Sequence, residues 1–146
     1  MNTNQKGFTL IESLIVLSIF MIISSITVFS LKPQHSAMED EAFLTQLKAD
    51  LYYAQQYAIS HQHEVSVVFV PEQYRYNMFL RPELPPIVQR NYSTNIYLTE
   101  GSIPLYFKFL NDGNVNKFGT FIIQTKNKIY VITVLIGKGR FYVKEY

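Results

Sequence analysis

The chain has 146 residues, no cysteine and a formal net charge of +2 at neutral pH. The absence of cysteine excludes disulfides, zinc–thiolate sites and cysteine nucleophiles, so burial has to stabilise the folded part. Eleven tyrosines and eleven phenylalanines supply large apolar surfaces for a core. The length fits one domain and an anchor.

The charges are unevenly distributed along the chain. Residues 8–103 carry five basic and nine acidic side chains, a balance of −4. Residues 104–146 carry seven basic and two acidic side chains, a balance of +5. Such polarity bears on the partners of the protein and says nothing about its fold.

The first expected element is an apolar run from Phe8 to Leu31, in which Glu12 is the only ionisable residue. At about 1.5 Å of rise per residue, this run predicts a transmembrane helix across a hydrocarbon core of about 30 Å. A carboxylate inside such a run costs about 2.5–3.5 kcal/mol on insertion scales, so Glu12 is expected to have a partner and a purpose. The run contains no cation that could pair with it.

The flanking charges predict the orientation of this helix. Lys6 and the α-amine precede the run, whereas Lys32 follows it and is itself soon followed by the acidic residues 39–41. The positive-inside rule therefore places the N-terminus in the cytoplasm and residues 32–146 on the extracytoplasmic side.

The junction between the polar segment 1–7 and the apolar run carries the most specific motif. Its sequence is Lys6-Gly7-Phe8-Thr9-Leu10-Ile11-Glu12. A secretory signal has a small-residue cleavage site after a shorter apolar core, whereas here the small-residue junction, Gly7-Phe8, precedes the run. The motif resembles the class III signal of type IV pilins and pseudopilins. A plain membrane anchor with a stray acid is the alternative, and it explains the placement of neither the glycine nor the acid.

The resemblance implies the roles of three residues. Residues 1–7 form a leader peptide, and a prepilin peptidase cuts after Gly7. The same enzyme methylates the new amine of Phe8. Glu12 accepts the Phe8 ammonium of a neighbouring subunit as subunits leave the membrane for a filament.

A second, amphipathic helix is expected at about residues 36–60. Lys32-Pro33 predicts a kink or a break before it, because proline removes a helical hydrogen bond. Ser36 and Glu39 have the spacing of a capping box. Apolar side chains then recur at steps of three and four on one face, which is typical of a helix on a core. These residues are Leu44, Leu47, Leu51, Ala54 and Ala58.

After residue 64 the pattern changes to that of β-strands. Strands are expected at 65–70, 74–80, 95–98, 103–110, 120–124, 128–136 and 140–144. Because Pro82, Pro85 and Pro86 interrupt the segment 81–89, we expect a loop there. This order predicts an α+β fold in which a long N-terminal helix, membrane-spanning and then amphipathic, packs on an antiparallel sheet. It is also the order of elements in pilins.

Three stretches of the tail resemble the strand–turn signature of minor pilins and minor pseudopilins. They are residues 109–113, 118–120 and 135–140. Small size, absence of cysteine and a composition rich in Lys, Asn, Ile and Tyr make the minor pilin of the Gram-positive competence pilus the best fit. The resemblance implies a structural role in assembling or initiating a pilus for DNA uptake, at the cell surface. The expected partners are the prepilin peptidase, other pilin-like subunits and the membrane.

The basic tail contains a further candidate surface. Lys126 and Lys128 flank one expected hairpin turn, and Lys138 and Arg140 flank the next. If both turns lie at the same end of the sheet, four cations project from one rim. Such a rim is consistent with contact to DNA phosphates, with contact to the acidic part of a neighbouring subunit, or with solvated strand ends.

Other functions stay open at this point. A type II secretion minor pseudopilin belongs to the same structural class, and a membrane-anchored DNA-binding receptor belongs to another. An anchored exterior enzyme is least consistent with the sequence, which shows no catalytic constellation. His61, His63 and Glu64 are explained by a solvated helix end, so we expect no metal, cofactor or small-molecule substrate.

Overall fold

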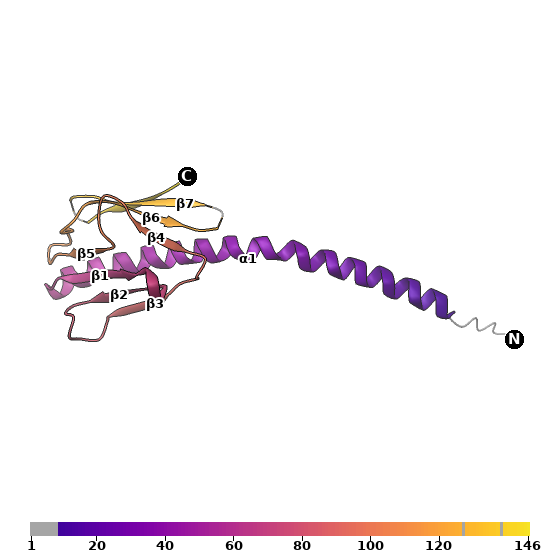
Figure 1. Ribbon diagram of the computed structural model, residues 1–146. Helices are drawn as coiled ribbons and strands as arrows, with labels where there is room; N and C mark the ends of the chain where they lie inside the picture. Colours follow the sequence, from indigo (N-terminus) through magenta and orange to yellow (C-terminus); the bar gives the residue numbers. More distant parts are fainter. Residues whose placement is uncertain (1–8, 127, 138) are drawn as a thin grey trace. The chain divides into compact units, whose positions relative to one another are not determined.

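The computed structural model describes residues 9–126, 128–137 and 139–146, and for residues 27–37 it describes the backbone only. The elements follow one another along the chain as shown in Figure 1. They are α1 (Leu10–His61), β1 (Val65–Val70), the 3₁₀ helix η1 (Pro71–Gln73), β2 (Arg75–Phe79), β3 (Val88–Asn91), β4 (Tyr97–Glu100), β5 (Tyr106–Phe109), β6 (Gly119–Gln124), β7 (Ile129–Val134) and β8 (Phe141–Glu145).

The chain divides into two compact units, the first ending at Ala37 and the second running from Met38 to Tyr146. The expected break at Pro33 is wrong, because α1 continues through this residue. A proline removes one backbone hydrogen bond, and the helical turns on both sides supply the others. Ser36 therefore lies inside the helix, and its spacing from Glu39 marks no helix start.

In the second unit, α1 contacts the core through the face that its periodicity predicts. The buried residues of this face include Leu44, Leu47, Leu51, Ala54 and Ala58. Figure 1 shows this part of the helix with β6 and β7 on one side and β2 and β3 on the other. The predicted core face is thus confirmed.

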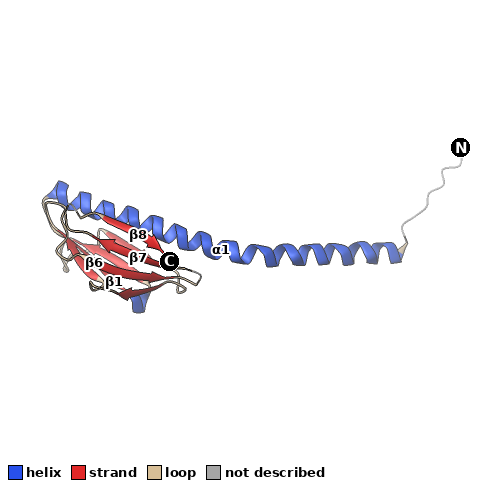
Figure 2. Cartoon of the chain, turned by 90° about the horizontal axis from the view of Figure 1, so that it is seen from above, coloured by secondary structure: helices blue, strands red, loops and turns tan. Residues whose placement is uncertain are grey.

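The strands form two four-stranded antiparallel sheets, whereas the sequence led us to expect one. Sheet A has the order β3-β2-β1-β5, and sheet B has the order β4-β6-β7-β8. The chain leaves sheet A after β3, adds β4 to sheet B, and returns to sheet A with β5 before it completes sheet B. Figure 2 shows β8 as the strand of sheet B that lies beside α1. Such exchanges depend on contacts between residues far apart in sequence, which local patterns do not encode.

Strand β3 corrects a second expectation, since a loop was expected at residues 81–89. β3 pairs with β2 so that Met78 lies opposite Val88 and Tyr76 lies opposite Arg90. The prolines at 82, 85 and 86 all precede the strand, so they do not interrupt its ladder.

One core joins the two sheets. Phe69 of β1 and Phe121 of β6 come from different sheets, and their ring centroids lie 5.2 Å apart. Phe107 of β5 packs edge-on against Phe109 with centroids 5.7 Å apart, and both rings are buried. Aromatic pairs of this geometry stabilise a core beyond their buried area, which suits a chain without disulfides.

The packing of α1 on this core can be tested at Leu51, because the side chain of this residue is only 1% exposed. Replacing Leu51 with Ala is expected to lower the free energy of unfolding of fragment 38–146 by about 2–5 kcal/mol. Urea denaturation measures this change. Leu84→Ala, at a residue 48% exposed, serves as the matched control and should stay within about 0.5 kcal/mol of wild type. A loss at Leu51 no larger than at Leu84 contradicts the packing.

Candidate functional site

The described part of the N-terminal motif begins with a helix cap. The hydroxyl oxygen of Thr9 accepts a hydrogen bond from the backbone N–H of Glu12 at 3.4 Å. The carbonyl of Thr9 accepts one from the N–H of Ser13 at 3.2 Å. Thr9 is therefore the N-cap of α1, and Glu12 occupies the third position of the first turn, as in a capping box. Our sequence analysis missed this cap, although Thr-x-x-Glu before an apolar run is its signal.

The start of the helix explains why an acid at position 12 is favourable. An acid in the first helical turn is stabilised by the helix dipole and by the unpaired N–H groups there. Gly7 and Phe8 lie outside the described residues, so cleavage at this junction and pairing with the Phe8 amine stay predictions.

The apolar side chains of α1 between Leu10 and Ile26 are exposed in this chain. No helix is apolar over a stretch long enough to cross a membrane within the part of the chain that the structure describes. The expected span of residues 8–31 includes Phe8 and the side chains of residues 27–31, which lie outside the described part.

A buried carboxylate connects α1 with sheet A in the second unit. Asp50 is 5% exposed, and it accepts hydrogen bonds from three side chains. The donors are the Tyr76 hydroxyl at 2.7 Å, Gln46 Nε2 at 2.9 Å and Arg90 Nε at 3.1 Å. A buried charge needs such partners, and these come from α1, β2 and β3. We call these four residues the Asp50 network.

Asp50 favours the protonated, donating forms of Tyr76 and Arg90 and orients the guanidinium. Burial and the hydrogen bond to Asp50 raise the pKa of the Tyr76 hydroxyl, which therefore stays a neutral donor. The hydrogen bond to Asp50 also raises the pKa of Arg90. The side chain of Arg90 is 51% exposed, whereas that of Asp50 is 8% exposed. A guanidinium is thus held at the surface in a defined orientation.

Replacing Asp50 with Asn is expected to lower the free energy of unfolding by about 1–3 kcal/mol, because Tyr76 and Arg90 lose a charged acceptor. Urea denaturation at neutral pH measures the change. The matched control is Glu83→Gln, which removes a carboxylate from an exposed loop and should change stability by less than about 0.5 kcal/mol. Equal effects of both changes would show that the network contributes no stability.

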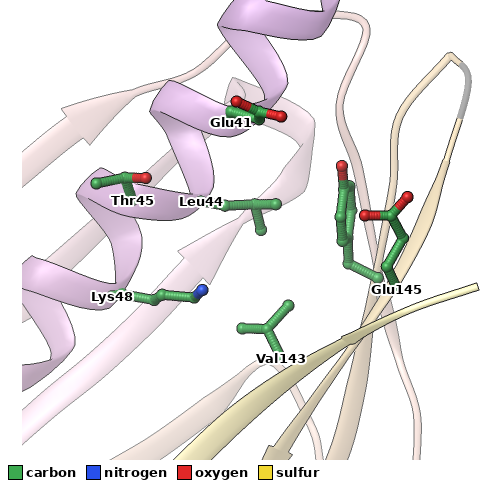
Figure 3. A pocket seen from close by; sticks show the side chains of 7 residues that line it. Glu41, Leu44, Thr45, Lys48, Val143 and Glu145 are labelled. Atoms are coloured by element: carbon green, nitrogen blue, oxygen red, sulfur yellow. The ribbon is translucent and has the colours of Figure 1, made fainter.

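Two grooves flank α1 in the second unit. One lies between α1 and β3, has a volume of about 590 Å³ and adjoins the Asp50 network. It is lined by Glu39, Ala42, Phe43, Gln46, Tyr76, Arg90, Asn91, Tyr92, Ser93 and Ile96. The other, of about 290 Å³, lies between α1 and sheet B (Figure 3). It is lined by Glu41, Leu44, Thr45, Lys48, Tyr130, Val143 and Glu145.

Two of the tail stretches singled out in the sequence meet at α1. Gln55 is 6% exposed, and its Nε2 donates a hydrogen bond to the carbonyl of Gly113 at 2.9 Å. Gly139 is buried there with φ +53°, and a Cβ at this position would collide with the Gly113 carbonyl and with Gln55. Only glycine fits both the conformation and the space. The turns near residues 113 and 139 therefore serve packing.

The structure does not bring the described cations of the basic tail, Lys126, Lys128 and Arg140, to one end of sheet B. The connection from β6 to β7 and the connection from β7 to β8 lie at opposite ends of β7, about 20 Å apart for a six-residue strand. Consecutive turns of an antiparallel meander alternate between ends, so the condition for a single cationic rim is not met. Lys128 pairs with Glu145 at 2.8 Å, Lys126 and Arg140 are exposed, and Lys138 lies outside the described residues.

Known proteins share both the N-terminal motif and the fold. Residues 2–28 match the family described as the prokaryotic N-terminal methylation motif. Over 141 residues the chain is 29% identical to the competence protein ComGD of Bacillus subtilis. The aligned region covers 97% of this chain and 94% of that protein. The type IV minor pilin FimU of Pseudomonas aeruginosa aligns with a TM-score of 0.60 and 18% identity, over 71% of this chain and 91% of that one. The fold is pilin-like.

The solved structures establish the fold of this pilin-like protein. The minor pseudopilin EpsH of the Vibrio cholerae type 2 secretion system gives a TM-score of 0.55 at 14% identity, over 73% of this chain and 96% of that one. Together with FimU, it confirms the α+β arrangement of an N-terminal helix on antiparallel strands. The methylation motif confirms the resemblance found at residues 6–12. The proteins matched here are a competence protein, a minor pilin and a minor pseudopilin.

The polar side chains that organise this pilin-like fold were missed at the sequence level. Asp50 and Gln55 were assigned no role, because polar residues on an amphipathic helix are usually solvated. Their spacing carried a signal, since Asp50 follows Leu47 by three positions and Gln55 follows Leu51 by four. Both therefore border the buried stripe and not the solvent face.

Proposed function

We propose that this pilin-like protein is a minor pilin of a competence pilus, with a structural role in assembling or initiating a filament for DNA uptake. The observation that carries the proposal is the likeness to ComGD, a competence protein, over 97% of the chain. The fold shared with a minor pilin and a minor pseudopilin supports a structural rather than an enzymatic role.

The N-terminal motif completes the proposal. A prepilin peptidase cuts the leader 1–7 after Gly7 and methylates Phe8. The helix over residues 8–31 crosses the cell membrane once, with its N-terminus in the cytoplasm, and residues 32–146 are extracytoplasmic. Glu12 then pairs with the Phe8 amine of a neighbouring subunit, and the assembled protein is displayed at the cell surface.

The outward face of α1 in the second unit supports assembly with other helices. The exposed residues of this face recur at steps of three and four, and none carries a formal charge. They are Met38, Ala42, Thr45, Ala49, Tyr53, Gln56 and Ser60. A helix that stays in water usually carries charges on its solvent face. An uncharged face on which Ala42, Thr45 and Ala49 are small suits close approach of another subunit.

Deletion of the gene tests the function. The deletion is expected to abolish uptake of added DNA and transformation, and expression of the gene from another site should restore both. Normal transformation together with a defect in protein secretion would support the type II secretion alternative instead. Unchanged transformation and unchanged secretion would contradict both pilin functions.

We propose that the basic tail contacts the acidic part of a neighbouring subunit. Because the two connections lie at opposite ends of β7, Lys126→Gln/Lys128→Gln and Lys138→Gln/Arg140→Gln are tested separately. At least one pair is expected to impair filament assembly while the affinity for double-stranded DNA stays unchanged. Filaments are quantified by immunoblotting of sheared material, and DNA affinity is measured by electrophoretic shift at two salt concentrations.

DNA contact by the tail predicts the opposite result. Each phosphate contact that is lost flattens the dependence of log affinity on log salt by about 0.9, so one pair changes the slope by about two. Assembly would then be retained in both double variants. Arg81→Gln, at an exposed residue outside the tail, is the control for the loss of positive charge.

A further inference from the structure

The groove between α1 and β3 combines two features that are independent of each other. The first is a strand edge that is unpaired among the described residues, where β3 is the outer strand of sheet A and pairs with β2 alone. The second is the guanidinium of Arg90, which Asp50 holds through Nε. The strand edge selects an extended backbone, and the guanidinium selects a negative charge.

The register identifies the backbone groups at this edge. Tyr92 donates its N–H to the carbonyl of Tyr74 at 2.8 Å, so these two residues form a hydrogen-bonded pair. Hydrogen-bonded and non-hydrogen-bonded pairs alternate along an antiparallel ladder. Asn91 and Gln89 are therefore in non-hydrogen-bonded pairs, and their N–H and C=O groups point away from β2. Such a row of groups accepts another extended chain.

The side chain of Arg90 gives the edge its chemical preference. Nε is bound to Asp50, while Nη1 and Nη2 have no hydrogen-bond partner among the described residues. A guanidinium that is held in this way loses little side-chain entropy when it binds a carboxylate through its two terminal nitrogens. Phe43, Tyr92 and Ile96 line the same groove and provide an apolar surface beside the charge.

We propose that this groove accepts an extended segment of a neighbouring pilin-like subunit as an added strand on β3, with one carboxylate of that segment on Arg90. A residue opposite Arg90 on the added strand lies on the same face, about 5 Å away between Cβ atoms, which an Asp or Glu side chain spans. Glu39 also lines the groove, so a segment with a single acid among uncharged residues fits better than an acidic run. This inference rests on the proposed role as a filament subunit.

Site-specific photo-cross-linking in cells that assemble the filament tests the proposal. A benzophenone amino acid at Gln89, on the open edge of β3, is expected to link to a peptide of a pilin-like subunit that carries Asp or Glu within two residues of the link. Mass spectrometry identifies that peptide. The same amino acid at Leu84, in the preceding exposed loop, should not give this product.

Charge changes show whether Arg90 selects the segment. Arg90→Gln and Arg90→Glu are expected to reduce the cross-linked product about tenfold, as for loss of a charge-assisted contact. Arg81→Glu should leave it unchanged. Reversing the partner's acid to Arg should restore the product with Arg90→Glu. Filaments without the product at Gln89, or a product that both Arg90 variants leave unchanged, would overturn this inference alone. Absence of filaments containing the wild-type chain would instead contradict the proposed function.

A binding measurement gives a result even if the Arg90 variants unfold in cells. The probe is the labelled peptide acetyl-Thr-Val-Glu-Val-Thr-amide, added to the full chain in detergent and followed by fluorescence anisotropy. Binding is expected to weaken about tenfold when the Glu of the peptide is replaced by Gln. Replacing the same Glu with Lys is expected to weaken binding further. Equal binding of the three peptides, or binding of none, would contradict the selection of an acidic strand.

Discussion

Replacing Gly7 with Leu is expected to leave the full-length precursor in the membrane and to abolish assembly. The physical reason is access, because a residue without a side chain enters a narrow protease cleft in an extended conformation that a Leu side chain obstructs. The family match over residues 2–28 includes this junction. Immunoblotting of membrane fractions measures the ratio of precursor to mature chain, which should change from mostly mature to entirely precursor.

Thr3→Leu in the same segment is the control, and it should be cut normally because it leaves the junction intact. N-terminal sequencing of the mature wild-type chain is expected to begin at Phe8. A mature chain that begins at any other residue, or normal processing of Gly7→Leu, would show that the junction is not the cleavage site.

The second large effect is expected at Glu12. Replacing Glu12 with Val removes a carboxylate that costs about 2.5–3.5 kcal/mol inside a membrane, so the chain should be retained there more strongly. It should also be lost from filaments, since the Phe8 ammonium of a neighbour is left without a counter-charge. Cleavage after Gly7 should be nearly unaffected. Sheared filaments and membrane fractions, compared by immunoblotting, measure the redistribution.

The helix cap suggests a matched variant that separates two roles of Glu12. Glu and Gln both serve at the third position of a capping box, whereas only Glu is charged. The bond from the backbone N–H of residue 12 to the Thr9 hydroxyl is kept in either variant, but only Gln can also supply the side-chain half of a capping box. Glu12→Gln is therefore expected to lose assembly as Glu12→Val does. Normal assembly of the Gln variant would assign Glu12 to capping and would remove the ammonium pair from the mechanism.

Local patterns of the sequence were sufficient for much of this structure. The steps of three and four identified the buried face of α1, because one side of a helix is determined by residues one turn apart. The β-branched residues in 65–70 predicted β1 at its observed bounds, since such side chains favour strands. The motif at residues 6–12 indicated the family, because it places rare features, a glycine junction and a lone acid, at a defined spacing.

The way in which these elements combine depends on pairing and packing that local patterns do not specify. The division into two sheets and the existence of β3 follow from strand pairing that no single segment specifies. The Asp50 network likewise joins α1 to residues 26 and 40 positions away. Such contacts form because a buried charge must find donors wherever the fold supplies them, and no local pattern specifies which donors these are. Local patterns therefore specified the buried face of α1 and most of the strands, whereas packing specified the two sheets, the grooves and the exposed guanidinium.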